Sequence, residues 1–77
     1  MHAREIRAMT TEEIEARLDE AYQRLFRLRF DWAAGQLRDN NQIRAVKRDI
    51  ARMKTILRER ELAAMMAAWQ EDEGEEA

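Results

Sequence analysis

Two apolar series, each repeating at alternating spacings of three and four residues, constrain this chain more than any other feature. The spacing places each series along one side of a helix, as in the seam of a coiled coil. The chain is therefore expected to fold as two long helices that bury one side each against the other. The first series is Ile14, Leu18, Ala21, Leu25, Leu28 and Trp32, and the second is Ile43, Val46, Ile50, Met53 and Leu57.

The residues around the two series mark where the helices begin and end. Thr10 with Glu13 three residues later is a capping-box pattern, and Gly35 suits the left-handed position at a helix end. The Asp-Asn-Asn cluster at 39–41 offers N-caps for the second helix. A connection this short makes consecutive helices antiparallel neighbours. We predict an all-α fold, an antiparallel two-helix hairpin with long helices over residues 10–34 and 40–69 and a short N-terminal helical turn.

Length and composition narrow the class of protein. A chain of 77 residues holds one small domain, and a lone hairpin of this size is expected to be marginally stable until a partner completes it. No stretch approaches the roughly 18 apolar residues of a membrane span, and the N-terminus lacks the apolar segment of a signal peptide. Cysteine is absent, which fits a reducing compartment. We expect a cytoplasmic protein that does not contact membranes.

Catalytic residue types are nearly missing. The chain has no cysteine and no serine, and its one histidine is His2 near the N-terminus. No nucleophile–base pair, metal-ligand cluster or glycine-rich phosphate loop can be assembled from what remains. We therefore expect no enzyme, no metal site and no cofactor.

The net charge of −2 conceals two regions of opposite sign. Fourteen cations against ten acids leave residues 1–60 at +4, whereas residues 61–77 hold six acids and no cation. A basic body followed by an acidic tail suits a nucleic-acid partner better than the total suggests. We predict an RNA-binding helical hairpin over residues 1–69 and an acidic disordered tail over residues 70–77.

The second predicted helix carries most of the expected RNA contacts. Its cations gather on one flank around two small residues, where the helix backbone can approach phosphates while the cations reach around it. An ordinary solvated or protein-binding face is the alternative. The candidates on this flank are Arg44, Lys47, Arg48, Ala51, Lys54, Thr55 and Arg58, and Arg52 is a further candidate next to Arg48 on the outer face. In the preceding linker, Gln36, Arg38 and Asn41 are either further RNA contacts or part of the turn chemistry that we favour for Asp39 and Asn40.

Two apolar groups fall outside the seams. Tyr22, Phe26 and Ala33 form a shoulder on the first helix, with Phe30 further out, and here widening the core or packing on a neighbouring protein is favoured over stacking on bases. Leu62, Met65 and Trp69, with Met66, form a second stripe that either covers Ile6 and Met9 or contacts another protein. Both groups are protein-contact candidates.

Several motifs together resemble the bacterial-type large-subunit ribosomal protein L-twenty-nine (L29) family. They are Ala3-Arg4-Glu5-Ile6-Arg7, Leu28-Arg29-Phe30, Gly35-Gln36-Leu37 and the block Ile43-x-x-Val46-Lys47-Arg48-x-Ile50-Ala51-Arg52-x-Lys54-Thr55. The resemblance covers about residues 1–60 without a gap. It implies a helical hairpin on large-subunit rRNA near the exit of the nascent-chain tunnel, with ribosomal protein L-twenty-three as its neighbour. Nascent-chain chaperones and targeting factors would meet it there.

The expected function is accordingly a ribosome-bound structural constituent of the large subunit. The family's basic block falls on the flank already selected by charge, at Lys47, Arg48, Arg52, Lys54 and Thr55. Two other classes remain open: a coiled-coil adaptor that binds a partner protein helix, and a regulator that dimerises through its seams.

Overall fold

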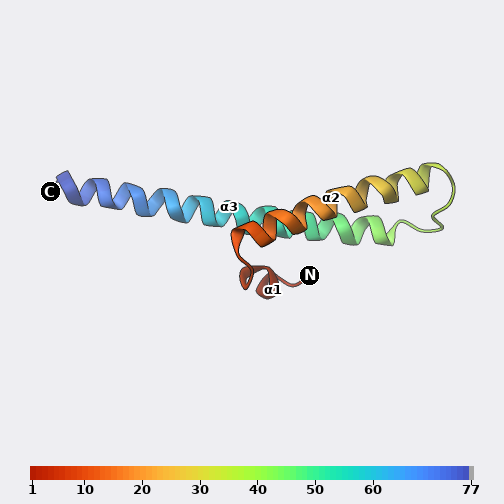
Figure 1. Cartoon of the computed structure of the whole chain (residues 1–77), viewed down its shortest axis with the longest axis horizontal. Helices are drawn as coiled ribbons and strands as arrows, with labels where there is room; N and C mark the ends of the chain where they lie inside the picture. The colour runs from red at the N-terminus through yellow and green to blue at the C-terminus, as the bar shows by residue number, and fades with distance from the viewer. Residues whose placement is uncertain (77) are drawn as a thin grey trace.

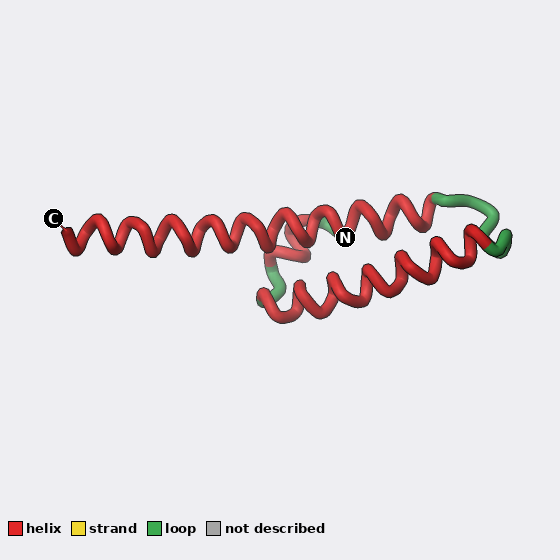
Figure 2. Tube along the Cα trace, turned by 90° about the horizontal axis from the view of Figure 1, so that it is seen from above, coloured by secondary structure: helices red, strands yellow, loops and turns green. Residues whose placement is uncertain are grey.

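The chain folds into three helices and an antiparallel hairpin. The computed structural model describes the backbone of residues 1–76 and side-chain surroundings through residue 71. Helix α1 spans Ala3–Arg7, α2 spans Thr11–Ala33 and α3 spans Asn41–Glu76, and these described residues form no strand. α2 runs back along the first half of α3, while α1 packs on another side of α3 (Figures 1 and 2). The predicted hairpin and its N-terminal helical turn are confirmed.

The ends of α2 follow the predicted capping chemistry. The Thr10 hydroxyl oxygen accepts a hydrogen bond from the Glu13 backbone N–H at 3.1 Å, which satisfies one of the free donors of the first turn. At the other end Gly35 adopts φ +75°, and the Gln36 N–H then donates back to the Asp31 carbonyl at 2.8 Å. This left-handed turn closes the helix and directs the chain toward α3.

The core consists of two small clusters stacked along the hairpin. Near the tip, Leu25 and Leu28 of α2 meet Val46 and Ile50 of α3. At the other end, α1 joins the two long helices and all three contribute buried side chains, listed as Ile6, Ile14, Met53 and Ile56. Each cluster holds only four buried residues, so the fold rests on little apolar area.

The structure corrects the predicted seams at two positions. Trp32 is 48% exposed, because Leu37 folds back from the linker and packs against the tip cluster with Ile43. Ile56 lies outside the predicted seam yet is buried, since it faces α1 rather than α2. The short N-terminal helix therefore adds a second buried side to α3.

α3 extends well past the hairpin, which makes the molecule 64 Å long. The Arg60 side chain donates to the Thr11 hydroxyl at 3.0 Å, so the start of α2 lies beside Arg60 and the helix beyond it projects alone (Figure 1). The helix continues to Glu76, past the predicted end at residue 69 and through residues 70–76, where we expected disorder. Four alanines over residues 63–68 and the absence of proline favour helix in the part that lies beyond α2. Residue 77 lies outside the described residues. The 62–69 stripe does not cover Ile6, which is buried by Ile14, Met53 and Ile56.

Candidate nucleic-acid interface

α3 presents most of its basic residues on a side that neither of the other helices covers. Val46 and Ile50 face α2, and Met53 and Ile56 face α1. At about 100° per residue, seven residues fall together on the remaining side. We call them the basic flank: Arg44, Lys47, Arg48, Ala51, Lys54, Thr55 and Arg58, all exposed. The structure thus exposes these seven residues on one surface, and Arg52 lies outside it, next to Arg48, where the sequence placed it.

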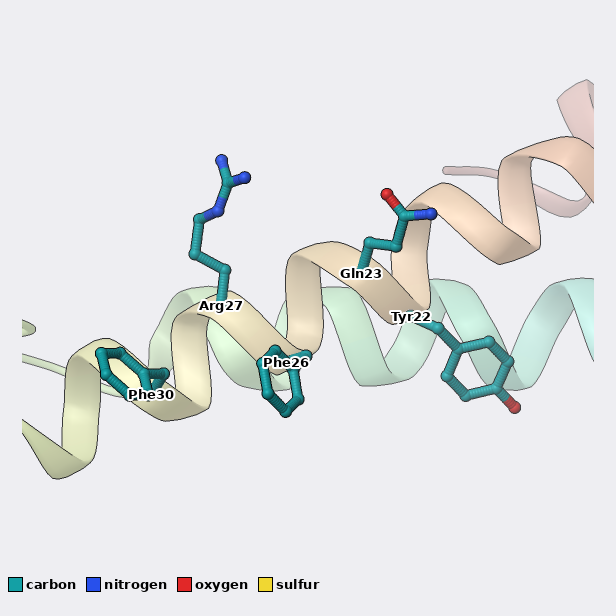
Figure 3. A pocket seen from close by; sticks show the side chains of 5 residues that line it. All are labelled: Tyr22, Gln23, Phe26, Arg27 and Phe30. Carbon is teal, nitrogen blue, oxygen red and sulfur yellow. The ribbon is translucent and has the colours of Figure 1, made fainter.

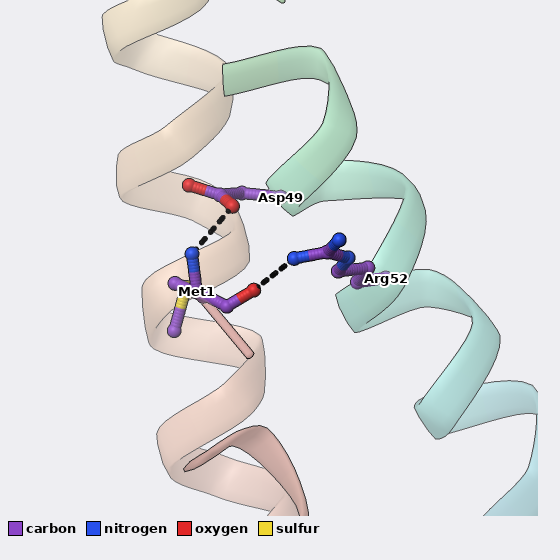
Figure 4. A network of polar contacts seen from close by, with 3 residues as sticks. All are labelled: Met1, Asp49 and Arg52. Atoms are coloured by element: carbon purple, nitrogen blue, oxygen red, sulfur yellow. Dashed lines mark hydrogen bonds and ion pairs between the residues drawn. The ribbon is translucent and has the colours of Figure 1, made fainter. Parts of the chain in front are cut away.

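The only acid between residues 43 and 58 is drawn away from the basic flank. Asp49 faces α1, where its carboxylate accepts a hydrogen bond from the α-amino group of Met1 at 2.9 Å (Figure 4). Arg52 lies beside it and donates to the Met1 carbonyl. Arg52 therefore ties the N-terminal segment to α3, while its side chain stays exposed.

Most cations of the basic flank have no acidic partner. Within residues 1–71, Arg44, Lys47, Arg48 and Lys54 form no ion pair. Arg58 pairs with Glu61 at 2.9 Å, but both side chains are exposed, and such pairs contribute little to stability. An arriving phosphate would therefore meet four unpaired cations and a fifth whose present partner is easily replaced.

Ala51 and Thr55 form a low, uncharged strip between these cations. The Thr55 hydroxyl donates to the Ala51 carbonyl at 2.8 Å, so its proton is engaged within the helix. The hydroxyl oxygen still accepts hydrogen bonds, which a ribose 2′-OH is able to donate. The strip thus offers close approach to a sugar–phosphate backbone rather than a charged contact.

α1 adds a basic residue that the sequence analysis did not select. Arg7 and Ala3 line a groove of about 230 Å³ together with Arg48 and Arg52 of α3. Arg7 also lies 3.8 Å from the Glu59 carboxylate, with both side chains more than half exposed. The sequence signal that could have identified Arg7 is the apolar residue before it, Ile6. Ile6 is buried against α3, and this holds α1 and its Arg7 beside α3.

The linker candidates lie at the tip of the hairpin. Gln36 and Arg38 are exposed in the connection, and Asn41 is exposed in the first turn of α3. The Asn41 N–H donates to the Asp39 carboxylate at 2.9 Å, which confirms capping chemistry for Asp39. Asn41 precedes Arg44 by one helical turn, so the tip extends the basic flank.

The aromatic shoulder of α2 forms an exposed row. Tyr22, Phe26 and Phe30 recur every four residues and line a shallow groove with Gln23 and Arg27 (Figure 3). Phe26 is 75% exposed and Phe30 66%, so the row does not widen the core. The aromatic row is rotated about the axis of α2 away from the buried seam of α2. The basic flank is rotated about the axis of α3 in the same sense, away from the seam of α3. In antiparallel helices equal rotation places both on the same side of the hairpin.

The described part of the chain lacks two other kinds of feature, a metal-binding cluster and a membrane-spanning helix. Residues 1–71, whose side chains the structure describes, contain no group of three or more His, Cys, Asp or Glu side chains placed to hold a metal ion. No helix there is sufficiently long and apolar to cross a membrane. The remaining protein-contact candidates, Leu62, Met65 and Trp69, lie exposed on the projecting part of α3.

Comparison with known proteins identifies one group of similar sequences. The family model described as Ribosomal L29 protein matches residues 4–60. Large ribosomal subunit protein uL29 of Geobacillus stearothermophilus is 58% identical over 64 residues, which cover 83% of this chain and 97% of that relative. The protein of the same name from Natranaerobius thermophilus is 56% identical over 62 residues, covering 80% and 95%. That of Corynebacterium diphtheriae is 55% identical over 60 residues, covering 78% and 79%. The matched residues 4–60 include α1, α2 and the basic flank.

Proposed function

Because this chain belongs to the ribosomal L29 protein family, we propose that it binds large-subunit rRNA through the basic flank of α3. It is a structural constituent of the large ribosomal subunit, bound to ribosomes in the cytoplasm, and not an enzyme. The assignment to the ribosome and to its large subunit rests on the family and on the name of its relatives. The exposed cations of α3 support the site of RNA contact that we propose.

One observation carries the RNA-binding proposal: four cations without ion-pair partners share one flank of α3 within the described residues 1–71. Phosphate contacts of this kind position a protein on RNA without reading its sequence. The shallow minor groove of an A-form helix, lined with 2′-hydroxyls and bordered by phosphates, suits a flat basic helix surface. The uncharged strip at Ala51 and Thr55 allows the approach that such a contact requires.

The finer location belongs to the same proposal. Family membership supports a place near the exit of the nascent-chain tunnel, beside ribosomal protein L-twenty-three. Nascent-chain chaperones and targeting factors would be reached from that place. The exposed row of Tyr22, Phe26 and Phe30 supports a neighbour on this side of the hairpin, since large aromatic side chains are typical anchors of protein interfaces.

The alternative functions require a seam that is open to another chain. In the structure the seam residues Leu25, Leu28, Val46 and Ile50 are buried against each other within one hairpin. A coiled-coil adaptor or a dimerising regulator would have to separate α2 from α3 to use them. The buried seam therefore favours the ribosomal function over both.

A paired charge reversal tests the site. Arg48→Glu with Lys54→Glu replaces two unpaired cations, and it leaves Arg52 to hold Met1. Arg17→Glu with Arg24→Glu makes the same charge change on exposed positions of α2 that face the other side of the hairpin. We expect the first variant to lose co-sedimentation with large subunits and the second to retain it, with equal helicity by far-UV circular dichroism. Equal loss in both variants would show that net charge, not the basic flank, determines binding.

A further inference from the structure

The part of α3 beyond Arg60 has no other described helix beside it (Figures 1 and 2). Arg60 marks the boundary, because its guanidinium donates to the Thr11 hydroxyl at 3.0 Å and to the Met9 carbonyl at 2.8 Å. We call residues 61–71 the α3 arm. Its large apolar side chains are exposed to between 43% and 69%: Leu62, Met65, Met66 and Trp69. Four such side chains on one short segment form an uncovered apolar surface.

The spacing of these four residues is that of a docking helix. They occupy positions i, i+3, i+4 and i+7, the pattern by which an amphipathic helix presents its apolar side to a partner. At about 100° per residue, the stripe is rotated by about 110° from the seam position of Ile50. Ala64 and Ala68 occupy the seam direction instead. A longer α2 would therefore leave this stripe uncovered, so its partner lies outside the hairpin.

Charge defines the kind of partner. No lysine or arginine follows Arg60, whereas residues 61–77 contain six acids, one before the stripe and five after it. An apolar stripe with acids at both ends is complementary to a helix whose own apolar stripe is flanked by lysine and arginine. We propose that the α3 arm binds a basic amphipathic helix of a partner protein through Leu62, Met65, Met66 and Trp69.

The same charges disfavour other occupants. RNA and anionic membranes would be repelled by the acidic segment. Two copies of the arm would bring acid beside acid, because neither arm contains a lysine or an arginine. Stable dimers bury about 1,200 Å² or more in total, which is more than a stripe of two helical turns supplies. The small area also makes the proposed complex reversible.

Trp69 provides the readout for a direct test. In the full chain carrying Trp32→Phe, Trp69 is the only indole, and its fluorescence reports on the stripe. The probe is a synthetic amphipathic peptide of Leu and Lys at helical spacing. Its counterpart carries Glu in place of every Lys. We expect a saturable blue shift with the Lys peptide and at least about tenfold weaker binding of the Glu peptide, because only the former complements the acids of the arm.

A matched pair of variants separates the stripe from the rest of the arm. Leu62→Gln with Met65→Gln should weaken binding of the Lys peptide at least about tenfold, since apolar anchors dominate such interfaces. Ala64→Gln with Ala68→Gln adds the same polar groups on the seam-facing side and should leave the affinity within about twofold. Far-UV circular dichroism checks that both variants keep their helicity.

Four results would overturn the proposal. The first is equal affinity for the Lys and Glu peptides, and the second is unchanged affinity in the Leu62 and Met65 variant. The third is a larger shift of Trp69 fluorescence with phosphatidylglycerol vesicles than with the Lys peptide. The fourth is the formation, in sedimentation equilibrium, of dimers that depend on the stripe. The test uses the protein without RNA. Its outcome is therefore independent of the proposed rRNA binding, which the charge reversals on the basic flank examine.

Discussion

Removing two of the unpaired cations should change how RNA binding depends on salt. Arg48→Ala with Lys54→Ala deletes two side chains of the basic flank that form no ion pair within residues 1–71. Because both side chains are exposed and form no ion pair within residues 1–71, their loss should leave the hairpin's stability within about 0.5 kcal/mol. Any loss of RNA affinity then reports on contacts to the RNA itself.

The magnitude follows from counterion release. Each phosphate neutralised by a protein cation adds about 0.7–0.9 to the slope of log K against log salt concentration. Four contacts predict that affinity falls about 50- to 150-fold as salt rises from about 50 to 200 mM. With two contacts left, the variant's affinity should fall only about 7- to 12-fold over the same range. The two binding curves should therefore converge at high salt.

Fluorescence anisotropy with labelled fragments of large-subunit rRNA measures both slopes across a series of KCl concentrations. Arg17→Ala with Arg24→Ala is the matched control, since it removes two exposed cations from the opposite side of the hairpin. Its slope should equal that of the unaltered chain. An unchanged slope in the Arg48 and Lys54 variant, or an equal decrease in the control, would refute the assignment of RNA binding to the basic flank.

Three further changes probe the scaffold that positions this flank, each followed by urea unfolding monitored with circular dichroism. Ile6→Ala should lower the free energy of unfolding by about 2–5 kcal/mol, because Ile6 is fully buried where all three helices meet. Phe26→Ala, at an exposed position, is the control, and an equal loss of stability in both variants would contradict this packing. Gly35→Ala should cost about 1–2 kcal/mol, because φ +75° penalises a Cβ even though no atom lies within 4 Å of it. Gly35→Asn should cost less, and equal costs for both would argue against a left-handed residue there. Arg60→Gln should cost about 1 kcal/mol, as its hydrogen bonds to three acceptors are half-exposed, and a neutral result would mean that they do not tie α3 to the start of α2.

The basic flank was largely predictable because it depends on one helix. Once α3 is assigned, the rotation per residue fixes that Arg44, Lys47, Lys54 and Arg58 share a side. The spacing of the apolar series and the caps at Thr10 and Gly35 are equally local, since each involves residues within about one turn of one another. The hairpin itself followed because a seven-residue connection, 34–40, leaves two adjoining helices no other easy arrangement.

Contacts between residues distant in sequence were decided by the tertiary structure. Asp49 and Arg52 both contact Met1, which lies about fifty residues away in the sequence, and this gives the only acid on this stretch of α3 a partner away from the basic flank. Ile56 is buried only because a five-residue helix packs on a second side of α3. No local sequence pattern specifies which side of α3 so short a helix will cover, since the position of α1 depends on where Ile6 can be buried.

The sequence by itself determined the helices, their antiparallel pairing and the charge of each side of α3, because these arise from local periodicity and capping. Only the tertiary structure decided which cations stay unpaired, that Trp32 leaves the core, and that α3 projects beyond Arg60 with its apolar stripe uncovered. The physical reason is that burial and ion pairing depend on the partners that packing brings together, and those partners lie far apart along the chain.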